Sequence, residues 1–139
     1  LGSISEDRRR HFRFVRSVPY RDMPGLYSLA ARSGGCLVST SRYESSPMTF
    51  IEAMACLCPV VSTDVGGVGE LISDHVTGRL YAAGDLDGGV QAILETIEPS
   101  RGWARQELTR SARAAVEERH AMAAVARKYR GLLERVVGS

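Results

Sequence analysis

The sequence predicts an α/β protein in which a parallel β-sheet has helices on both faces. Residues 59–63, PVVST, form a continuous β-branched run, as expected of a strand that is covered on both sides. Ahead of this run, four residues recur at the spacing of one helix face: Ile51, Met54, Ala55 and Cys58. A second strand-like segment, CLVST at 36–40, precedes the helix. Strand, helix and strand in close succession predict parallel pairing through a right-handed crossover.

Two further strand-like segments extend the expected sheet. Residues 12–15, FRFV, and residues 77–81, TGRLY, bring it to about four strands. In the helix between the two main strands, Ser46 can serve as N-cap. Pro47 suits the first helical position, because no N–H is needed there.

Helical patterns fill most of the second half of the chain. Glycines open a short helix at 66–72, GGVGELI, and residues 85–97 form a helix with acidic residues at its positive end. Residues 101–137 alternate between Arg/Glu-rich and Ala/Val/Leu-rich stretches. This alternation predicts two amphipathic helices with a break near 118–121.

The composition is that of an ordinary globular domain. Of 139 residues, 44% are hydrophobic and 24% charged, which suits one domain with one core. A net charge of +2 gives no general case for nucleic-acid binding, and no apolar run reaches the roughly 18 residues of a membrane span. Cys36, Cys56 and Cys58 lack the spacing of a zinc site. We interpret them as small core thiols in a reducing compartment.

Two glutamates indicate a ligand site. Glu44 lies in a Ser/Pro-rich break, and Glu52 lies inside the apolar helix, where an ionised carboxylate is costly unless it is paired or binds a ligand. Helical side chains lean toward the N-terminus, so Glu52 can reach the crevice beyond the carboxyl ends of the strands. Two carboxylates there can accept hydrogen bonds from sugar hydroxyls, and the helix N-terminus suits a phosphate. Together they indicate a nucleotide-sugar; the alternative is a structural Glu52 paired with an arginine.

The stretch YESSPMTFIEAMACLCPVVSTDVGGVGELISDHVTGRLY, residues 43–81, resembles the donor-binding half of retaining GT-B glycosyltransferases of family four, the glycosyl transferases group 1. Their pattern is two glutamates separated by seven residues, then Ala-Met-Ala, Pro-Val-Val, Asp-x-Gly-Gly and a Thr-Gly turn. The resemblance runs from about residue 12 to about residue 98, and RHAMAAVARKYRGLLERV resembles the closing helix of the family. It implies a Rossmann-like sheet that forms a truncated C-terminal half of a GT-B enzyme.

The resemblance also implies roles for matching residues. Glu44 would be the catalytic-site residue that contacts hydroxyls of the transferred sugar, and Glu52 would bind the ribose. The other implied contacts are the backbone N–H groups of Ser46, Met48 and Thr49 toward the sugar and the diphosphate, Val18 against the base, and Gly66 and Gly67 beside the diphosphate. Neither a cofactor nor a metal is expected, because basic residues and the helix dipole neutralise the leaving group in most members.

The chain departs from the family pattern in two ways. Arg16 and Leu57 stand where the family has glycine, and Gly69 stands where it has proline. The acceptor-binding first domain is missing, as are the first strands of the second domain with their Arg and Lys phosphate ligands. We therefore expect residues 1–100 to form a partial nucleotide-sugar-binding domain and residues 101–139 to be C-terminal helices that pack on it.

The implied reaction transfers a hexosyl group from a nucleotide-diphosphate sugar to an acceptor with retention, and the isolated fragment is expected to be inactive. The acceptor stays open between a glycan, a lipid and a small molecule. Two alternatives are a non-catalytic scaffold domain derived from this fold and a GT-B sugar-nucleotide epimerase. We expect a cytoplasmic protein, with peripheral membrane association open for the full-length chain. A truncated sheet edge also predicts a dimer through residues 11–18.

Overall fold

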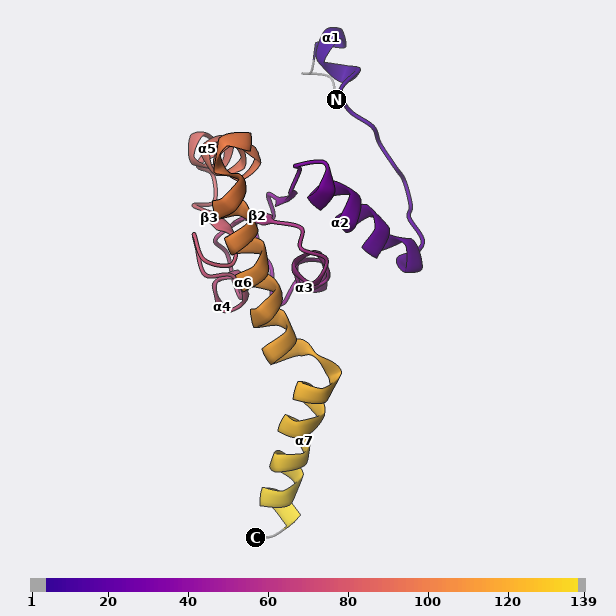
Figure 1. Cartoon of the computed structure of the whole chain (residues 1–139), viewed down its shortest axis with the longest axis vertical. Helices are drawn as coiled ribbons and strands as arrows, with labels where there is room; N and C mark the ends of the chain where they lie inside the picture. Colours follow the sequence, from indigo (N-terminus) through magenta and orange to yellow (C-terminus); the bar gives the residue numbers. More distant parts are fainter. Residues whose placement is uncertain (1–4, 138–139) are drawn as a thin grey trace.

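A three-stranded parallel sheet is the framework of the molecule (Figure 1). The computed structural model describes residues 5–137. The strands are β1 (Leu37–Ser39), β2 (Val60–Thr63) and β3 (Arg79–Tyr81), in this order across the sheet. Leu37 aligns with Val60, and Val61 aligns with Arg79, so the three strands share one carboxyl-end edge. The predicted α/β fold with a parallel sheet is confirmed.

Helices lie on both faces of this sheet. The helices of residues 5–137 are α1 (Glu6–Arg9), α2 (Met23–Arg32), α3 (Met48–Ala55), α4 (Val68–Leu71), α5 (Leu86–Ile97), α6 (Gly102–His120) and α7 (Met122–Val137), with short 3-10 helices η1 (Tyr20–Asp22) and η2 (Pro99–Arg101). Val60 packs in one core cluster with α3, whereas Val61 is buried outside that cluster. Successive strand residues point to opposite faces, and α5 contacts β2 and β3. One face therefore holds α3 and the other α5.

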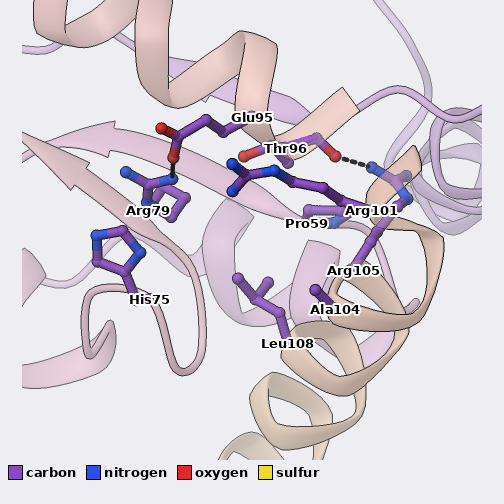
Figure 2. Close-up of a pocket in the computed structure, with 9 residues that line it drawn as sticks. All are labelled: Pro59, His75, Arg79, Glu95, Thr96, Arg101, Ala104, Arg105 and Leu108. Carbon is purple, nitrogen blue, oxygen red and sulfur yellow. Dashed lines mark hydrogen bonds and ion pairs between the residues drawn. The ribbon is translucent and has the colours of Figure 1, made fainter. Parts of the chain in front are cut away.

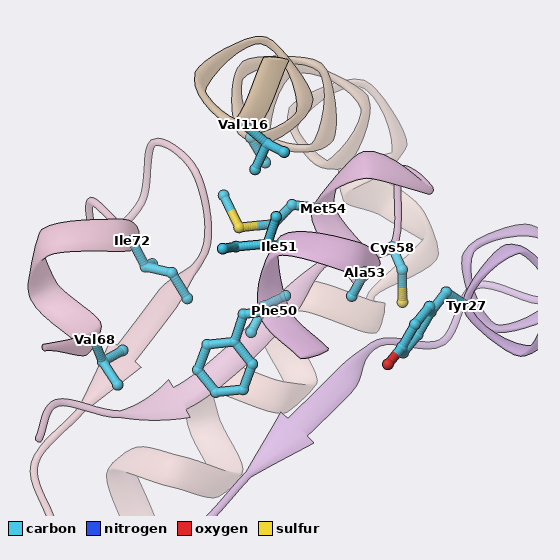
Figure 3. Packing of buried hydrophobic residues seen from close by; sticks show 11 residues of the cluster. Tyr27, Phe50, Ile51, Ala53, Met54, Cys58, Val68, Ile72 and Val116 are labelled. Carbon is cyan, nitrogen blue, oxygen red and sulfur yellow. The ribbon is translucent and has the colours of Figure 1, made fainter. Parts of the chain in front are cut away.

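The main core lies between α2, α3, β2, α4 and α6 (Figure 3). The helix α3 contributes the largest share, because four of its eight residues are buried: Phe50, Ile51, Ala53 and Met54. Val116 of α6 and Val68 of α4 pack against them, and Tyr27 closes the side toward α2. Of the predicted helix face, Ile51, Met54 and Cys58 are buried, whereas Ala55 is exposed.

Residues 12–15, predicted as a strand, do not form one. They have no regular structure, and Phe12, Phe14 and Val15 are exposed. A strand requires a neighbour for its backbone N–H and C=O groups, and within residues 5–137 no strand pairs with this segment. The sheet of the described residues therefore has three strands rather than about four. A dimer through residues 11–18 stays a prediction.

The start of α3 also differs from the prediction. Pro47 has ψ 104°, an extended value, so Pro47 itself is the N-cap and Met48 is the first helical residue. Ser46 then lies one position too early for its hydroxyl to cap the helix. The C=O of Pro47 accepts the first helical hydrogen bond, from the N–H of Phe50 at 3.0 Å.

The end of α3 is a Schellman turn built around Leu57. The N–H of Cys58 donates to the C=O of Ala53 at 2.9 Å, and the N–H of Leu57 donates to the C=O of Met54 at 3.1 Å. This arrangement puts Leu57 at φ 59°, a left-handed conformation that favours glycine. The turn leads the chain directly into Pro59 and β2.

The two C-terminal helices break where the sequence predicts. Ala121 has ψ 141°, which ends α6 before α7 begins. The helix α6 packs on α3, whereas α7 projects away from the sheet and has no buried residue (Figure 1). None of the helices in residues 5–137 combines the length and the apolar character needed to cross a membrane.

One arginine of α6 joins distant parts of the chain. The guanidinium of Arg105 donates to the C=O of Thr96 at 3.0 Å, of Ala31 at 3.2 Å and of Gly35 at 2.6 Å. These carbonyls belong to the last turns of α5 and α2 and to the turn before β1. Arg105 therefore fixes α6 against the amino-end side of the sheet.

Candidate functional site

The loops that follow β1 and β2 touch each other at the carboxyl-end edge of the sheet. The N–H of Gly67 donates to the C=O of Glu44 at 2.9 Å. A Cβ atom on Gly66 would collide with the C=O of Glu44, and one on Gly67 would collide with the C=O of Ser45. The hydroxyl of Thr63 donates to the C=O of Ser41 at 2.6 Å and holds the start of the same loop. The glycine pair thus lets the loop that bears Glu44 lie flat against the loop after β2.

Glu44 lines a hollow of about 430 Å³ between β1, α2 and α3. Its side chain is half-buried, and Tyr27, Ser39, Ser41 and Thr49 line the same hollow. Hydroxyl groups therefore dominate the polar side of this space. The structure brings two predicted site residues, Glu44 and Thr49, to one surface.

Glu52 is held by a phenol of α2. The hydroxyl of Tyr27 donates to the Oε2 atom of Glu52 at 3.3 Å, and Tyr27 itself lines the hollow with Glu44. Burial and then the negative charge of Glu52 raise the pKa of Tyr27 to about 12, so the phenol remains a donor at neutral pH. A hydrogen bond with Glu52 likewise raises the pKa of Tyr20.

The structural alternative for Glu52 required an arginine. Within the described residues Glu52 makes no salt bridge with an arginine. A carboxylate has about four acceptor sites on its two oxygens, so a phenol partner leaves room for further donors. Glu52 is half-buried and does not itself line the hollow of Glu44, to which it is connected through Tyr27.

Ser46 and Gly67 line a second hollow, on the other side of the loop. It measures about 550 Å³ and lies between α4 and the joint of α6 with α7. Arg119, Arg127 and Lys128 make its wall basic, together with the acidic Glu70 and Glu118. The hollow beside the predicted diphosphate residues Ser46 and Gly67 is thus bordered by three cations.

The remaining predicted residues are placed less closely together. Met48 begins α3 with an exposed side chain, and helix geometry leaves the N–H groups of Met48 and Thr49 without partners inside α3. Pro47 has no N–H, so this end of the helix offers one donor fewer. Val18 is half-buried ahead of η1 and lines neither hollow.

Tyr27 is the site residue that sequence reasoning missed, because α2 itself was not predicted. The signal was present in the sequence: Met23, Tyr27, Ala30 and Ala31 have helical spacing, and all four pack on the core. Pro24 in the first turn and Gly34, at φ 82° beyond the last, are typical helix boundaries. Among residues 5–137 no three His, Cys, Asp or Glu side chains gather as a metal site would require.

Comparison with known proteins gives one family. The model of the glycosyl transferases group 1 matches residues 5–115. A probable sucrose-phosphate synthase of Thermosipho melanesiensis is 33% identical over 79 residues, which are 57% of this chain and 19% of that protein. The chain thus spans about a fifth of the length of this curated relative.

Solved structures agree with this family. Sucrose-phosphate synthase from Thermosynechococcus elongatus superposes with a TM-score of 0.76 at 28% identity, over 91% of this chain and 30% of that one. Anabaena Alr3699/HepE, solved in complex with UDP, superposes with a TM-score of 0.70 at 26% identity, over 82% of this chain and 30% of that one. The same protein has also been solved in complex with UDP-glucose.

Proposed function

Because this chain belongs to the glycosyl transferases group 1, we propose that it forms the donor-binding part of a transferase that moves a hexosyl group from a nucleotide-diphosphate sugar to an acceptor, with retention. The contact of the Gly66–Gly67 turn with the backbone of Glu44 is the observation on which the proposal rests. It brings a carboxylate, a glycine turn and a helix N-terminus to one edge of a parallel sheet. Open α/β sheets bind ligands at this edge.

In this proposal the donor lies across the two loops. Glu52 accepts hydrogen bonds from the ribose hydroxyls while Tyr27 fixes its orientation, and Glu44 contacts hydroxyls of the transferred sugar. The diphosphate meets the backbone N–H groups of Ser46, Met48 and Thr49, beside Gly66 and Gly67, and Val18 borders the base. A diphosphate is a good ligand for free N–H groups and the positive end of a helix. The UDP and UDP-glucose complexes of Anabaena Alr3699/HepE support a donor of this class.

The acceptor side of the reaction belongs to residues beyond this chain. The chain covers 30% of each solved relative, and a transferase closes two domains around its donor. The reaction as proposed needs neither a cofactor nor a metal, and the full-length protein would act in the cytoplasm. The acceptor remains a glycan, a lipid or a small molecule.

A binding panel tests the proposal directly. UDP, GDP and ADP, free and as glucose conjugates, are titrated calorimetrically into the 139-residue chain. We expect the nucleotides with one of the three bases to bind more tightly than those with the other two. Glu52→Gln keeps the shape and one acceptor for Tyr27 but removes the charge, so the affinity should fall by about 1.5–3 kcal/mol. Unfolding free energy should change by less than about 1 kcal/mol.

Glu107→Gln on the exposed surface of α6 is the matched control, since it removes the same charge away from both hollows. It should leave the affinity unchanged. If none of the nucleotides binds, the non-catalytic scaffold interpretation is favoured. Strong destabilisation by Glu52→Gln with unaltered affinity would show that Glu52 is structural.

A further inference from the structure

A separate cavity lies at the opposite edge of the sheet, where the strands begin (Figure 2). Pro59 directly precedes β2 and Arg79 is the first residue of β3, and both line this cavity. The end of α5 and the first turns of α6 complete its walls through Thr96, Ala104 and Leu108. The donor site proposed above is at the carboxyl-end edge, so the two sites do not share a residue.

Positive charge exceeds negative charge in this cavity. Its lining residues include three guanidinium groups but one carboxylate, that of Glu95. Arg79 forms an ion pair with Glu95, and its Nε atom lies 3.3 Å from Oδ1 of Asp74, just outside the lining. Arg105 is engaged with its three backbone carbonyls. Even with Asp74 included, the cluster retains one positive charge without a carboxylate of its own.

That charge is on Arg101. In Figure 2 its side chain extends across the cavity toward Arg79 and Glu95, above Pro59. Within the described residues its guanidinium makes no hydrogen bond or ion pair, although its charge is one of the influences that lower the pKa of Glu95. Arg79 and Arg105, in contrast, are each held by several partners. A guanidinium presents five N–H donors in a planar fork that matches oxyanion geometry. Arg101 is therefore the cation in this cavity that is available to a ligand.

The size of the cavity limits what can bind. Its volume is about 110 Å³, about a quarter of the 430 Å³ hollow beside Glu44. A space of this size favours a small anion over a nucleotide-sugar. Pro59, Ala104 and Leu108 form an apolar wall on one side of the cavity, whereas Arg101 is exposed to solvent.

We propose that this cavity is a phosphate-binding site, distinct from the donor site, in which Arg101 supplies the charge that contacts the anion. His75 lies at its rim, on a loop fixed by the carboxylate of Asp74, whose Oδ1 accepts the N–H of His75 at 3.0 Å. The ligand is either free phosphate or the phosphate group of a small monoester, because the cavity is small and its available cation suits a single oxyanion.

The test is a phosphate titration of the 139-residue chain, followed by ³¹P NMR and calorimetry at constant ionic strength set with chloride. We expect saturable binding that Arg101→Gln weakens about tenfold, since one charge-assisted contact is removed. Arg110→Gln is the matched control: it removes the same charge from α6, and its side chain lines none of the described hollows. It should change the affinity less than twofold.

A parallel titration with a hexose 6-phosphate separates the two ligand sources. Tighter binding of the monoester would identify a sugar phosphate, and equal or weaker binding would identify free phosphate. Three results would overturn the proposal: no saturation with either ligand, an equal loss in the Arg101 and Arg110 variants, or phosphate affinity that Arg101→Gln leaves unchanged. The last result would place the anion at the N-terminus of α3 instead. Arg101 is exposed, and its side chain makes no hydrogen bond or ion pair within residues 5–137, so the variant should remain folded.

Discussion

The carboxylate of Glu95 shows how one residue links stability to pH. Gln91 donates to its Oε1 atom at 3.0 Å, and Arg79 forms an ion pair with its Oε2 atom. These two contacts, in that order, lower the pKa of Glu95 from 4.5 to about 2. A carboxyl group with a lowered pKa stabilises the folded state at pH values above the pKa that it has in the unfolded state. This contribution disappears as pH falls from about 4.5 toward about 2.

Glu95→Gln should therefore destabilise the protein at pH 7 by about 1–3 kcal/mol, the usual range for hydrogen bonds to a charged group. The difference between wild type and variant should shrink as pH is lowered through the window from 4.5 to about 2. Urea unfolding at pH 7, 4 and 3 measures this. A difference that stays constant over this range would show that the Glu95 contacts do not depend on its charge.

At the scale of single residues, the sequence pointed to two carboxylates as candidate ligand contacts but did not show what holds them. Glu52 was singled out because a charge inside an apolar helix needs an explanation, and Glu44 because it lies in the loop that leads to the same crevice. The partner of Glu52 could not be deduced, since Tyr27 is 25 positions away and the contact depends on how α2 packs on α3. Long-range packing of this kind has no local sequence signal.

Among the structural elements, the glycine turn between β2 and α4 has a clear steric requirement. Gly67→Ala places a methyl group against the C=O of Ser45, which should cost about 1–3 kcal/mol of stability as an overpacked site. Gly69→Ala, two residues later inside α4, meets the nearest atom at 3.5 Å, an ordinary contact. It should be neutral or raise stability by up to about 1 kcal/mol, because alanine favours a helix over glycine.

Thermal unfolding of both glycine variants provides the comparison, and nucleotide titration of the same samples adds a second measurement. The proposed function predicts that Gly67→Ala also weakens donor binding, since it moves the loop of Glu44. If the two variants are equally stable, the two loops do not pack as closely as the structure indicates.

The turn after α3 offers a second test at this scale. Leu57 occupies a left-handed position at φ 59°, where residues other than glycine are strained by about 1–2 kcal/mol. Leu57→Gly and Leu57→Ala both remove the half-exposed side chain, but glycine alone removes the strain. We expect the glycine variant to be more stable than the alanine variant by about 1 kcal/mol in chemical denaturation. Equal stabilities would contradict the strain.

Strong periodicity explains which elements were predicted correctly. The β-branched run of β2, the amphipathic pattern of α3 and the break between α6 and α7 are all local features, and the structure has each of them. Residues 12–15 have the composition of a strand but no neighbouring strand among the described residues. The strand predicted there from composition alone was therefore wrong. The helix α2 was missed because a proline and a glycine near its start obscured an otherwise regular spacing.

At the scale of the whole molecule, we expect donor binding to be possible without sugar transfer. The chain has the candidate donor residues, whereas closure around a donor requires a second domain. We therefore expect the 139-residue chain to bind a nucleotide-sugar without transferring it. A radiolabelled sugar-transfer assay with mono- and disaccharide acceptors should show no turnover above the hydrolysis of the donor alone. Turnover by the chain itself would contradict the proposed division of roles.

The three carbonyls held by Arg105 have a consequence for the lifetime of the native state. Two of them lie 74 and 70 positions away in the chain, and such contacts can form only after long loops have closed at a considerable entropic cost. Arg105 should thus be engaged late in folding, after the rate-limiting barrier. Its contacts then slow unfolding and have little effect on the folding rate. A single side chain would in this way determine how long the molecule persists once folded.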